Sequence, residues 1–475
     1  MKKKILRYQF VIYACLSLFA MTACSDWLDV KPKTEVEADK LFDTESGFKE
    51  ALAGVYTAMT KPGLYGRELT FGLLDAVAQQ WAFTTTDNNH VYYDAVNYDY
   101  ESTTSRPMMD SIWGKMYQTI ANVNSILEYV DKKNVFTGNN REIIKGEALA
   151  IRAYVHFDLL RLFAKNAVSA SADDGIPYVT ELTKQVTRSV SPKQVIANVV
   201  SDLNAALECL AVDPILTGKE ITEQDDHGYL INRNYHLNYY AVAGLLARVQ
   251  LYAGNYIEAA RNARIVIDAH RDNGKFPWIE SSNISTESKE SRDFTFSTEH
   301  LFALNIRKMT EYTTGYLVGT ERPLLLRAGK TNLMPNAEYR REYLFEEGSS
   351  NLPIKLLQVK NSKFAYRMPM IRLSEMYYIL AECVNNGAGQ QDEDAVELLN
   401  EVLKARGYED SYLIDPAAVN TREAIQAEIL KEYQREFICE GQLFYYHKRQ
   451  GDAILNEKVV KYVFPKPENE EEFGK

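Results

Sequence analysis

The sequence predicts a mainly α-helical protein with one large domain, long irregular loops and a few short strands. Three observations predict this class. Apolar residues recur at steps of three and four over most long segments, whereas strand-like alternation is short and scattered. Hydrophobic residues make up 46% of the 475 positions, enough for a substantial core. Several helix patterns are separated by only a few residues, which favours antiparallel helix pairs.

The first 23 residues have the pattern of a bacterial secretory signal and not of a membrane span. Basic residues at positions 2, 3, 4 and 7 precede an apolar run at 10–20, and Met21-Thr22-Ala23 lead into Cys24. This arrangement resembles the lipobox of bacterial lipoproteins, which implies that Cys24 becomes a lipidated mature N-terminus and 24–40 a tether. The alternative is plain secretion with an unmodified cysteine.

Charge and cysteine usage narrow the classes of partner. Cleavage before Cys24 removes four positive charges and shifts the formal charge from −11 to −15. Nucleic acid is not an expected partner, because nucleic acids and anionic headgroups select basic surfaces. No later stretch is expected to cross a bilayer.

The cysteines Cys209, Cys383 and Cys439 lack CxxC spacing, which favours packed thiols, although one disulfide pair stays open.

Helices are expected in order along the chain at 47–59, 111–130, 146–164, 192–210, 237–253, 256–270, 372–384, 394–405 and 422–440. In the third of these, Ile151, Val155 and Leu159 lie on one apolar stripe. Ser191 and Thr421 are expected to cap the N-termini of the helices that follow them.

One helix pair resembles a known repeat. Gly254-Asn255-Tyr256 followed by Ala259 is similar to the turn of a tetratricopeptide repeat, where glycine permits a tight turn and small alanines let two helices approach. A looser pair covers 377–406. The spacing between these pairs is irregular, so we expect divergent helix pairs within one domain at 41–475. Its repeat-rich part would cover about 41–272, and its loop-rich and C-terminal helical part about 273–475.

Signals for catalysis and metal binding are weak. No HExxH motif occurs, and no two of the seven histidines are four residues apart. Gly329-Lys330-Thr331 is like the end of a phosphate-binding loop, but Leu324 stands where that loop needs glycine. Neither GxSxG nor GxGxxG is present. We therefore expect no enzyme, no metal and no cofactor, although counting carboxylates does not exclude a glycosidase pair.

Two polar clusters on helices are expected to be structural. The first comprises Arg152, Tyr154, His156 and Asp158, and the second Arg435, Glu436 and Glu440. Buried polar groups on helices are usually satisfied by hydrogen bonds and ion pairs within the core. These clusters therefore indicate fold and not ligand.

Several motifs follow one another along nearly the whole chain after the signal. They are CSDWLD at 24–29, FKEALAGVY at 48–56, GEALAIRAYVHFDLLRLF at 146–163, MIRLSEMYYILA at 370–381, LLNEVLKARG at 398–407 and ILKEYQREFICEGQLFYYHKRQG at 429–451. In this order they resemble the SusD/RagB family of outer-membrane lipoproteins from Bacteroidetes. The last motif departs from the family pattern at Tyr433, Gln434, Tyr446 and His447, while Phe437, Gly441 and Phe444 are retained.

The resemblance implies a SusD-like fold and a lipoprotein anchored in the outer membrane, facing the medium. It implies a protein that captures an oligosaccharide or peptide and acts as the lid of a SusC-like TonB-dependent barrel transporter. The alternative is a helical-repeat scaffold that organises envelope proteins without binding a small ligand.

Long polar loops rich in aromatic residues are the expected ligand site. An aromatic face can hold a sugar ring while Asn and Asp bind its hydroxyls. By position, the resemblance implies a first contact loop at 81–93 and a second near 312–316. The candidates are Trp81, Asp87, Asn88, Asn89, Tyr92, Tyr93, Tyr312 and Tyr316, with Trp278 as a weaker one. The alternative for each tyrosine is simple packing over the helical scaffold.

Overall fold

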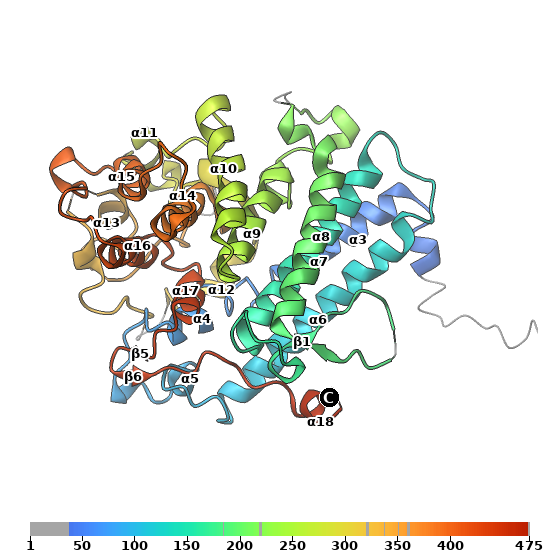
Figure 1. Cartoon of the computed structure of the whole chain (residues 1–475), viewed down its shortest axis with the longest axis horizontal. Helices are drawn as coiled ribbons and strands as arrows, with labels where there is room; N and C mark the ends of the chain where they lie inside the picture. Colours follow the sequence, from blue (N-terminus) through green and yellow to red (C-terminus); the bar gives the residue numbers. More distant parts are fainter. Residues whose placement is uncertain are drawn as a thin grey trace, which may run out of the picture.

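The computed structural model describes residues 38–183, 185–217, 221–319, 323–336, 338–349, 351–358 and 362–473. Cys24, the expected signal and most of the expected tether lie outside the described residues. Within them the predicted fold class is confirmed, because helices dominate and the strands are few and short (Figure 1).

Helices occupy both halves of the chain. In the first half they are α3 (Glu45–Met59), α4 (Leu73–Val77), α5 (Tyr93–Val96), α6 (Ser105–Val130), α7 (Asn140–Phe163), α8 (Pro192–Cys209), α9 (Tyr239–Tyr252) and α10 (Tyr256–Asn273). In the second half they are α11 (Ser281–Ile284), α12 (Met309–Thr313), α13 (Tyr339–Tyr343), α14 (Leu373–Cys383), α15 (Ala395–Ala405), α16 (Arg422–Glu436), α17 (Gln442–Gln450) and α18 (Glu468–Phe473). Three antiparallel two-stranded sheets pair β1 (Ile176–Pro177) with β2 (Ser189–Val190), β3 (His300–Asn305) with β4 (Arg367–Arg372), and β5 (Ile454–Leu455) with β6 (Lys458–Val459).

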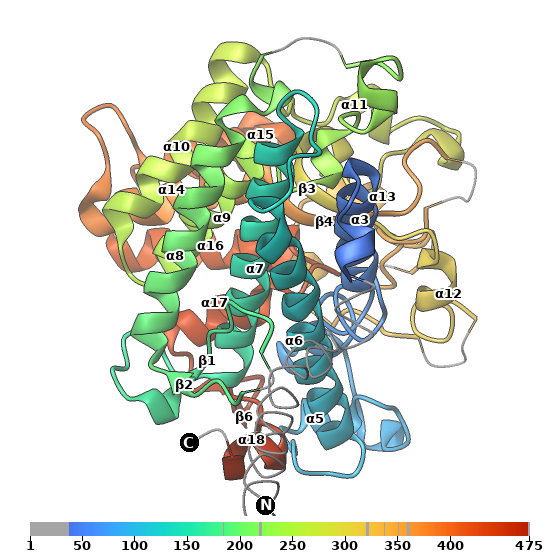
Figure 2. The ribbon, with the colours of Figure 1, turned by 90° about the vertical axis from the view of Figure 1, so that its right-hand side faces the viewer.

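The long helices form a continuous series of neighbours. Helix α7 packs between α6 and α8, and α3 packs against α6, so these four lie side by side in Figure 2. The series continues through α9, α10 and α14 to α15. Helix α7 is buried along almost its whole length, including Glu147, His156 and Asp158, because helices cover it on several sides. This explains why its polar residues must find partners inside the protein.

The predicted tetratricopeptide-like pair is confirmed as α9 and α10, which pack against each other. Gly254 at their junction has φ +75°, a conformation that favours glycine. Ala259, Ala260 and Ala263 on α10 are buried, so the small side chains let the two helices approach closely.

Both predicted N-caps are confirmed. The Ser191 hydroxyl accepts a hydrogen bond from the backbone N–H of Gln194 at 3.2 Å, and the Thr421 hydroxyl accepts one from Ala424 at 3.1 Å. Each satisfies one backbone donor that the first turn of a helix leaves unpaired.

The helix expected at 422–440 is too long, because α16 ends at Glu436 and a separate helix, α17, begins at Gln442. The chain turns where Cys439 and Gly441 adopt φ values of +67° and +71°. Asp75, far away in sequence, accepts the backbone N–H of Cys439 at 2.8 Å and that of Gly441 at 3.1 Å. A distant side chain therefore fixes this break, and local periodicity does not report it.

Other helix boundaries also differ from expectation. Helices α6 and α7 each begin six residues earlier than the predicted starts at 111 and 146. The long polar loops contain short elements: α5 lies within residues 84–106, and α11, β3 and α12 lie between residues 274 and 313. These pieces are too short to show a helical period, so the sequence pattern does not predict them.

Helix α8 and the turn that follows it, Pro192–Val212, form one segment that is long and apolar enough to span a membrane by length and composition alone. This differs from the expectation that no later stretch has that length and composition. In the folded chain α8 packs against α7 and α9, as a core helix of a domain does.

The expected structural clusters are confirmed. Arg152 pairs with Asp202 and donates at 2.7 Å to each of its carboxylate oxygens, and the ring of His156 bonds to the Arg152 carbonyl at 2.9 Å. Glu436 and Glu440 pair with arginines and a lysine from other parts of the chain. Cys209, Cys383 and Cys439 are free thiols.

Candidate functional site

The two predicted contact loops lie next to each other in the structure. The backbone N–H of Ala82 donates to the Leu325 carbonyl at 2.8 Å, and that of Arg327 donates to the Gln80 carbonyl at 2.8 Å. Trp81 and Leu326 form an antiparallel bridge between these bonds. Residues 80–82 and 325–327 are thus held together by backbone pairing, although more than two hundred residues separate them.

Trp81 supports this junction from within. Its side chain is 0% exposed, and its indole N–H donates to the Phe71 carbonyl at 2.8 Å. In this conformation the ring offers no face to solvent. Trp81 therefore holds the loops in place and does not present a surface for stacking.

The centre of the junction is a group of four side chains that we call the loop cluster: Arg67, His90, Tyr92 and Tyr316. The Arg67 guanidinium lies 4.5 Å from the centre of the Tyr316 ring, an attractive cation–π geometry. The rings of Tyr92 and Tyr316 are 5.8 Å apart, and those of His90 and Tyr316 are 6.3 Å apart. Side chains from three separate segments therefore meet at one place.

Charge and burial fix the protonation of the loop cluster. The Tyr92 hydroxyl donates to Glu68 at 2.8 Å, and Arg67 donates to the other carboxylate oxygen of Glu68 at 2.8 Å. Burial, reinforced by the negative charge of Glu68, raises the pKa of Tyr92 well above its usual value. Burial also lowers the pKa of His90, against the attraction of Asp87. At neutral pH the loop cluster therefore combines an uncharged imidazole with a charged guanidinium.

The polar tip of the first loop is open to solvent. Asn88 and Asn89 are exposed, and Tyr93 is half-buried. The Asp87 carboxylate accepts the backbone N–H of Thr84 at 2.7 Å and its hydroxyl at 2.8 Å, so it shapes the turn that presents the two asparagines. This tip can supply amide donors and acceptors beside the aromatic rings.

The remaining candidates differ in position. Tyr312 lies on α12, one turn before Tyr316, and is 7% exposed. Trp278 is not brought to the loop cluster. Its ring packs 5.2 Å from His270 on α10 and 5.1 Å from Tyr377 on α14.

Sequence reasoning missed Arg67, Glu68 and His90. Arg67 and Glu68 lie in a turn-rich stretch after α3 that carries no motif, and His90 stands alone without ligand-like spacing. The density of polar and aromatic residues and the family resemblance pointed to the segment around position 90, but not to these three residues. The contacts that create the loop cluster are long-range, so spacing along the chain does not report them.

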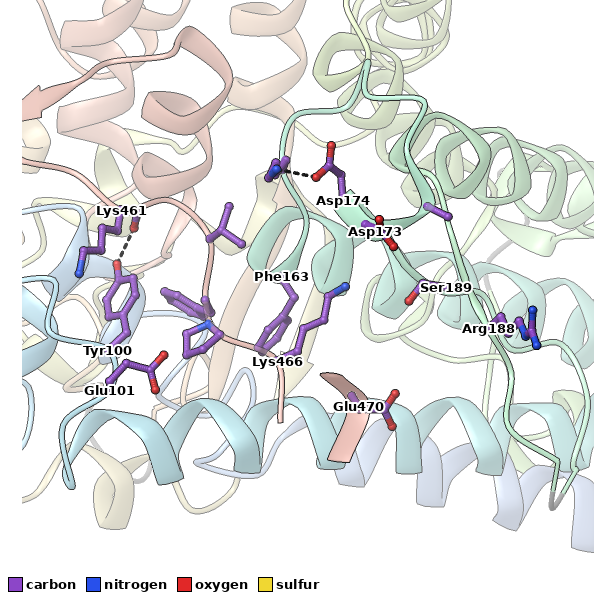
Figure 3. A pocket seen from close by; sticks show the side chains of 15 residues that line it. Tyr100, Glu101, Phe163, Asp173, Asp174, Arg188, Ser189, Lys461, Lys466 and Glu470 are labelled. Carbon is purple, nitrogen blue, oxygen red and sulfur yellow. Dashed lines mark hydrogen bonds and ion pairs between the residues drawn. The ribbon is translucent and has the colours of Figure 1, made fainter. Parts of the chain in front are cut away.

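A separate cavity of about 770 Å³ lies beside the C-terminal segment and shares no lining residue with the loop cluster. Figure 3 shows Tyr100, Glu101 and Lys461 on one side of it, and Asp173, Arg188 and Ser189 on the other. Its charged groups are mixed in sign, and Lys165 and Asp174 form an ion pair at 2.7 Å across one wall. Among the described residues, no group of three His, Cys, Asp or Glu side chains lies where it could hold a metal ion.

Two family models match the chain. Residues 26–219 match one described as "Starch-binding associating with outer membrane", and residues 319–471 match one described as the SusD family. These stretches contain α3 to α8, α14 to α17 and the first contact loop, whereas Tyr312 and Tyr316 of the second loop lie outside them.

Curated relatives are distant in sequence. SusD-like protein P38 of Formosa agariphila is 21% identical over 519 aligned positions, which cover 98% of this chain and 94% of that protein. SusD-like protein P25 of the same organism is 24% identical over 216 residues, and that match spans only 38% of its length and 44% of this chain.

Solved structures share the fold over almost the whole chain. A SusD superfamily protein from Bacteroides vulgatus has a TM-score of 0.69 at 19% identity, covering 90% of this chain and 96% of that one. Surface glycan-binding protein A from Bacteroides thetaiotaomicron has a TM-score of 0.63 at 16% identity, covering 91% and 97%. With both family models matching in sequence and this fold shared, the chain belongs to the SusD/RagB family.

Proposed function

We propose that this protein captures an oligosaccharide at the outer surface of the cell and passes it to a SusC-like TonB-dependent barrel transporter, which it covers as a lid. The ligand would lie against the loop cluster and the exposed tip of the first loop. The proposed role is binding alone, without cleavage of the ligand. Lipidation of Cys24 would hold the protein at the outer membrane.

The observation that carries this proposal is the junction of the two contact loops. Backbone hydrogen bonds at Ala82 and Arg327 hold the loops together, and buried Trp81 packs beneath them. A binding surface assembled from two loops on a rigid helical body costs little conformational entropy when ligand arrives. This supports a site that is largely formed before binding.

The chemistry of the junction suits a sugar. The rings of Tyr93 and Tyr316 are half-buried and so expose part of their apolar surface, while Asn88 and Asn89 offer amide groups nearby in sequence. Arg67 adds a charged donor against Tyr316. A sugar has C–H faces for the rings and hydroxyls for the amides, so each kind of group has a partner.

The family and its relatives support an oligosaccharide over a peptide. One matching family is described as starch-binding, and one structure of the same fold is named a surface glycan-binding protein. A peptide ligand would call for an open strand edge or a row of side-chain pockets. The loop cluster instead supplies aromatic rings, and the tip of the first loop supplies the amides of Asn88 and Asn89.

Binding is tested by calorimetric titration of the purified protein with a panel of oligosaccharides and with a matched panel of peptides. We expect micromolar binding of at least one oligosaccharide. Tyr316→Ala should weaken it by about 2- to 12-fold, because an aromatic contact contributes roughly 0.5–1.5 kcal/mol beyond its buried area. Asn88→Ala should also weaken it without changing the thermal stability, since Asn88 is exposed.

The control is Tyr412→Ala, which removes an exposed tyrosine, 58% accessible, from a different part of the chain. Its affinity for the oligosaccharide should equal that of the wild type. Binding of peptides alone would refute the ligand class. Oligosaccharide binding that neither Tyr316→Ala nor Asn88→Ala changes would refute the position of the site.

Delivery to a transporter is tested separately. The full-length lipoprotein, purified from native membranes, should bring with it the barrel transporter encoded beside it. Replacing Cys24 with alanine should release the protein from the membrane fraction, and protease treatment of intact cells should digest the wild type. A protein that resists this treatment until the cells are lysed would face inward, against the proposal.

A further inference from the structure

A small cavity lies where helices α7, α9, α14, α16 and α17 meet, and its volume is about 30 Å³. That is more than the ~10–15 Å³ that a single bound water requires. Arg161, Arg248 and Tyr445 line it and are 2%, 5% and 4% exposed, respectively. A guest in this cavity would therefore touch both the repeat pair and the C-terminal helices.

Hydrogen-bond donors lining the cavity lack good partners. The Tyr445 hydroxyl is buried and has no hydrogen-bond partner among the described residues. The Arg161 Nη1 group reaches only the side-chain oxygen of Gln442 at 3.4 Å, and the Arg248 Nη1 group reaches only the Tyr154 hydroxyl at 3.5 Å. Both distances are longer than a good hydrogen bond of this type. A buried donor left unpaired is unfavourable, so a guest that accepts hydrogen bonds would stabilise the fold.

The acceptors at the cavity already accept hydrogen bonds from its arginines. Both oxygens of Glu375 accept hydrogen bonds from Arg248, at 2.6 and 2.7 Å. The Gln442 side-chain oxygen is the acceptor that Arg161 reaches at 3.4 Å. A water molecule would have to share these acceptors or use the Tyr445 hydroxyl oxygen for its own two hydrogens, whereas an anion needs no acceptor.

The lining of the cavity is more basic than acidic. Arg161, Arg248 and Arg449 line it together with one carboxylate, that of Glu375. Arg161 pairs with Asp158 and Arg449 with Glu382, and neither of these two carboxylates belongs to the lining. Three guanidinium groups therefore lie at the cavity against one carboxylate.

We infer that this cavity binds a monovalent inorganic anion of halide size, chloride under ordinary conditions. The anion accepts hydrogen bonds from Tyr445, Arg161 and Arg248 and is attracted by the arginines of the lining. The volume is too small for a sugar, so this site is distinct from the loop cluster. The role of the anion is to join α9, of the tetratricopeptide-like pair, to the C-terminal helices α14, α16 and α17.

The first test uses the wild-type protein. Crystals grown with sodium bromide should show an anomalous scattering peak between Tyr445, Arg161 and Arg248. In solution, the midpoint of thermal unfolding should rise by about 1.5 °C for each tenfold increase in chloride or bromide above the dissociation constant. Sodium gluconate at the same ionic strength provides the baseline, because gluconate is too large for the cavity.

The second test removes one oxygen atom. Tyr445→Phe should lose at least half of the halide-dependent rise, yet in gluconate it should be no less stable than the wild type, since it removes an unpaired buried hydroxyl. The matched control is Tyr98→Phe, another buried tyrosine, whose hydroxyl donates to the Val77 carbonyl at 3.0 Å. Its halide dependence should equal that of the wild type.

Two results would overturn the inference. One is a cavity without a bromide peak in crystals that show bromide only on the surface, which would assign the space to water. The other is the same unfolding midpoint in chloride and in gluconate.

Discussion

Replacing Glu436 with glutamine should destabilise the protein more than any surface charge change on the same helix. Glu436 is 1% exposed, and its carboxylate accepts from Arg340 at 2.7 Å and from Arg406 at 2.6 Å, as well as from Arg372. Burial alone would raise the pKa of Glu436, but Arg406, Arg372 and Arg340 outweigh burial and hold that pKa well below its usual range.

The magnitude follows from what the change leaves behind. Glutamine keeps the shape of glutamate and removes its charge, so three buried guanidiniums lose a shared counter-ion. Removing one partner from a buried ion pair costs about 3–5 kcal/mol. Because Glu436 lies at the centre of a network and not in a single pair, we expect a loss of free energy of unfolding in this range or above it.

Urea unfolding at pH 7, followed by circular dichroism, measures this loss. The control is Glu428→Gln on the same helix, which breaks an ion pair of 2.6 Å to Lys431. Lys431 is 44% exposed, so this change should cost less than about 1 kcal/mol. If Glu436→Gln costs no more than Glu428→Gln, the buried network does not stabilise the fold as argued.

Two further predictions concern stability. His156 and His300 are buried, and burial lowers the pKa of each to about 3. The pKa of a histidine in an unfolded chain is about 6.5. Between pH 6.5 and 3 the unfolded state binds more protons than the folded state, so the free energy of unfolding falls as the pH is lowered. Urea unfolding should show a loss of about 2 kcal/mol per histidine between pH 7 and pH 5. A flat pH profile would contradict this. Gly441→Ala should cost about 1–3 kcal/mol in thermal unfolding, because φ is +71° and the new Cβ would lie 2.7 Å from the Leu69 carbonyl oxygen. Gly114 lies inside α6, and a Cβ added there would have no neighbouring atom within 4 Å. Gly114→Ala should therefore stabilise the protein by about 0.5–1 kcal/mol. Equal effects of the two glycine substitutions would refute the argument.

Much of the fold could be predicted because it depends on local pattern. The apolar stripe of α7, the caps at Ser191 and Thr421, and the turn at Gly254 all report structure within a few residues of themselves. The end of α16 could not be predicted in this way. It depends on Asp75, whose carboxylate binds the chain more than 360 residues away.

Only part of the candidate site could be predicted from the sequence. Family resemblance pointed to both contact loops, and the structure brings Tyr92 and Tyr316 within 5.8 Å of each other. The burial of Trp81 could not be predicted from the sequence. An aromatic residue among polar residues is compatible both with a ring packed in the core and with a ring that contacts ligand. Arg67 and Glu68 join the site only through long-range contacts.

The central claim is that ligand binds at the loop cluster, and a crystal structure of the protein with its tightest-binding oligosaccharide tests it most directly. We expect density for the sugar between Asn88, Tyr93 and Tyr316. Density for the sugar in the 770 Å³ cavity beside Tyr100 and Lys466, with the loop cluster bare, would contradict the account.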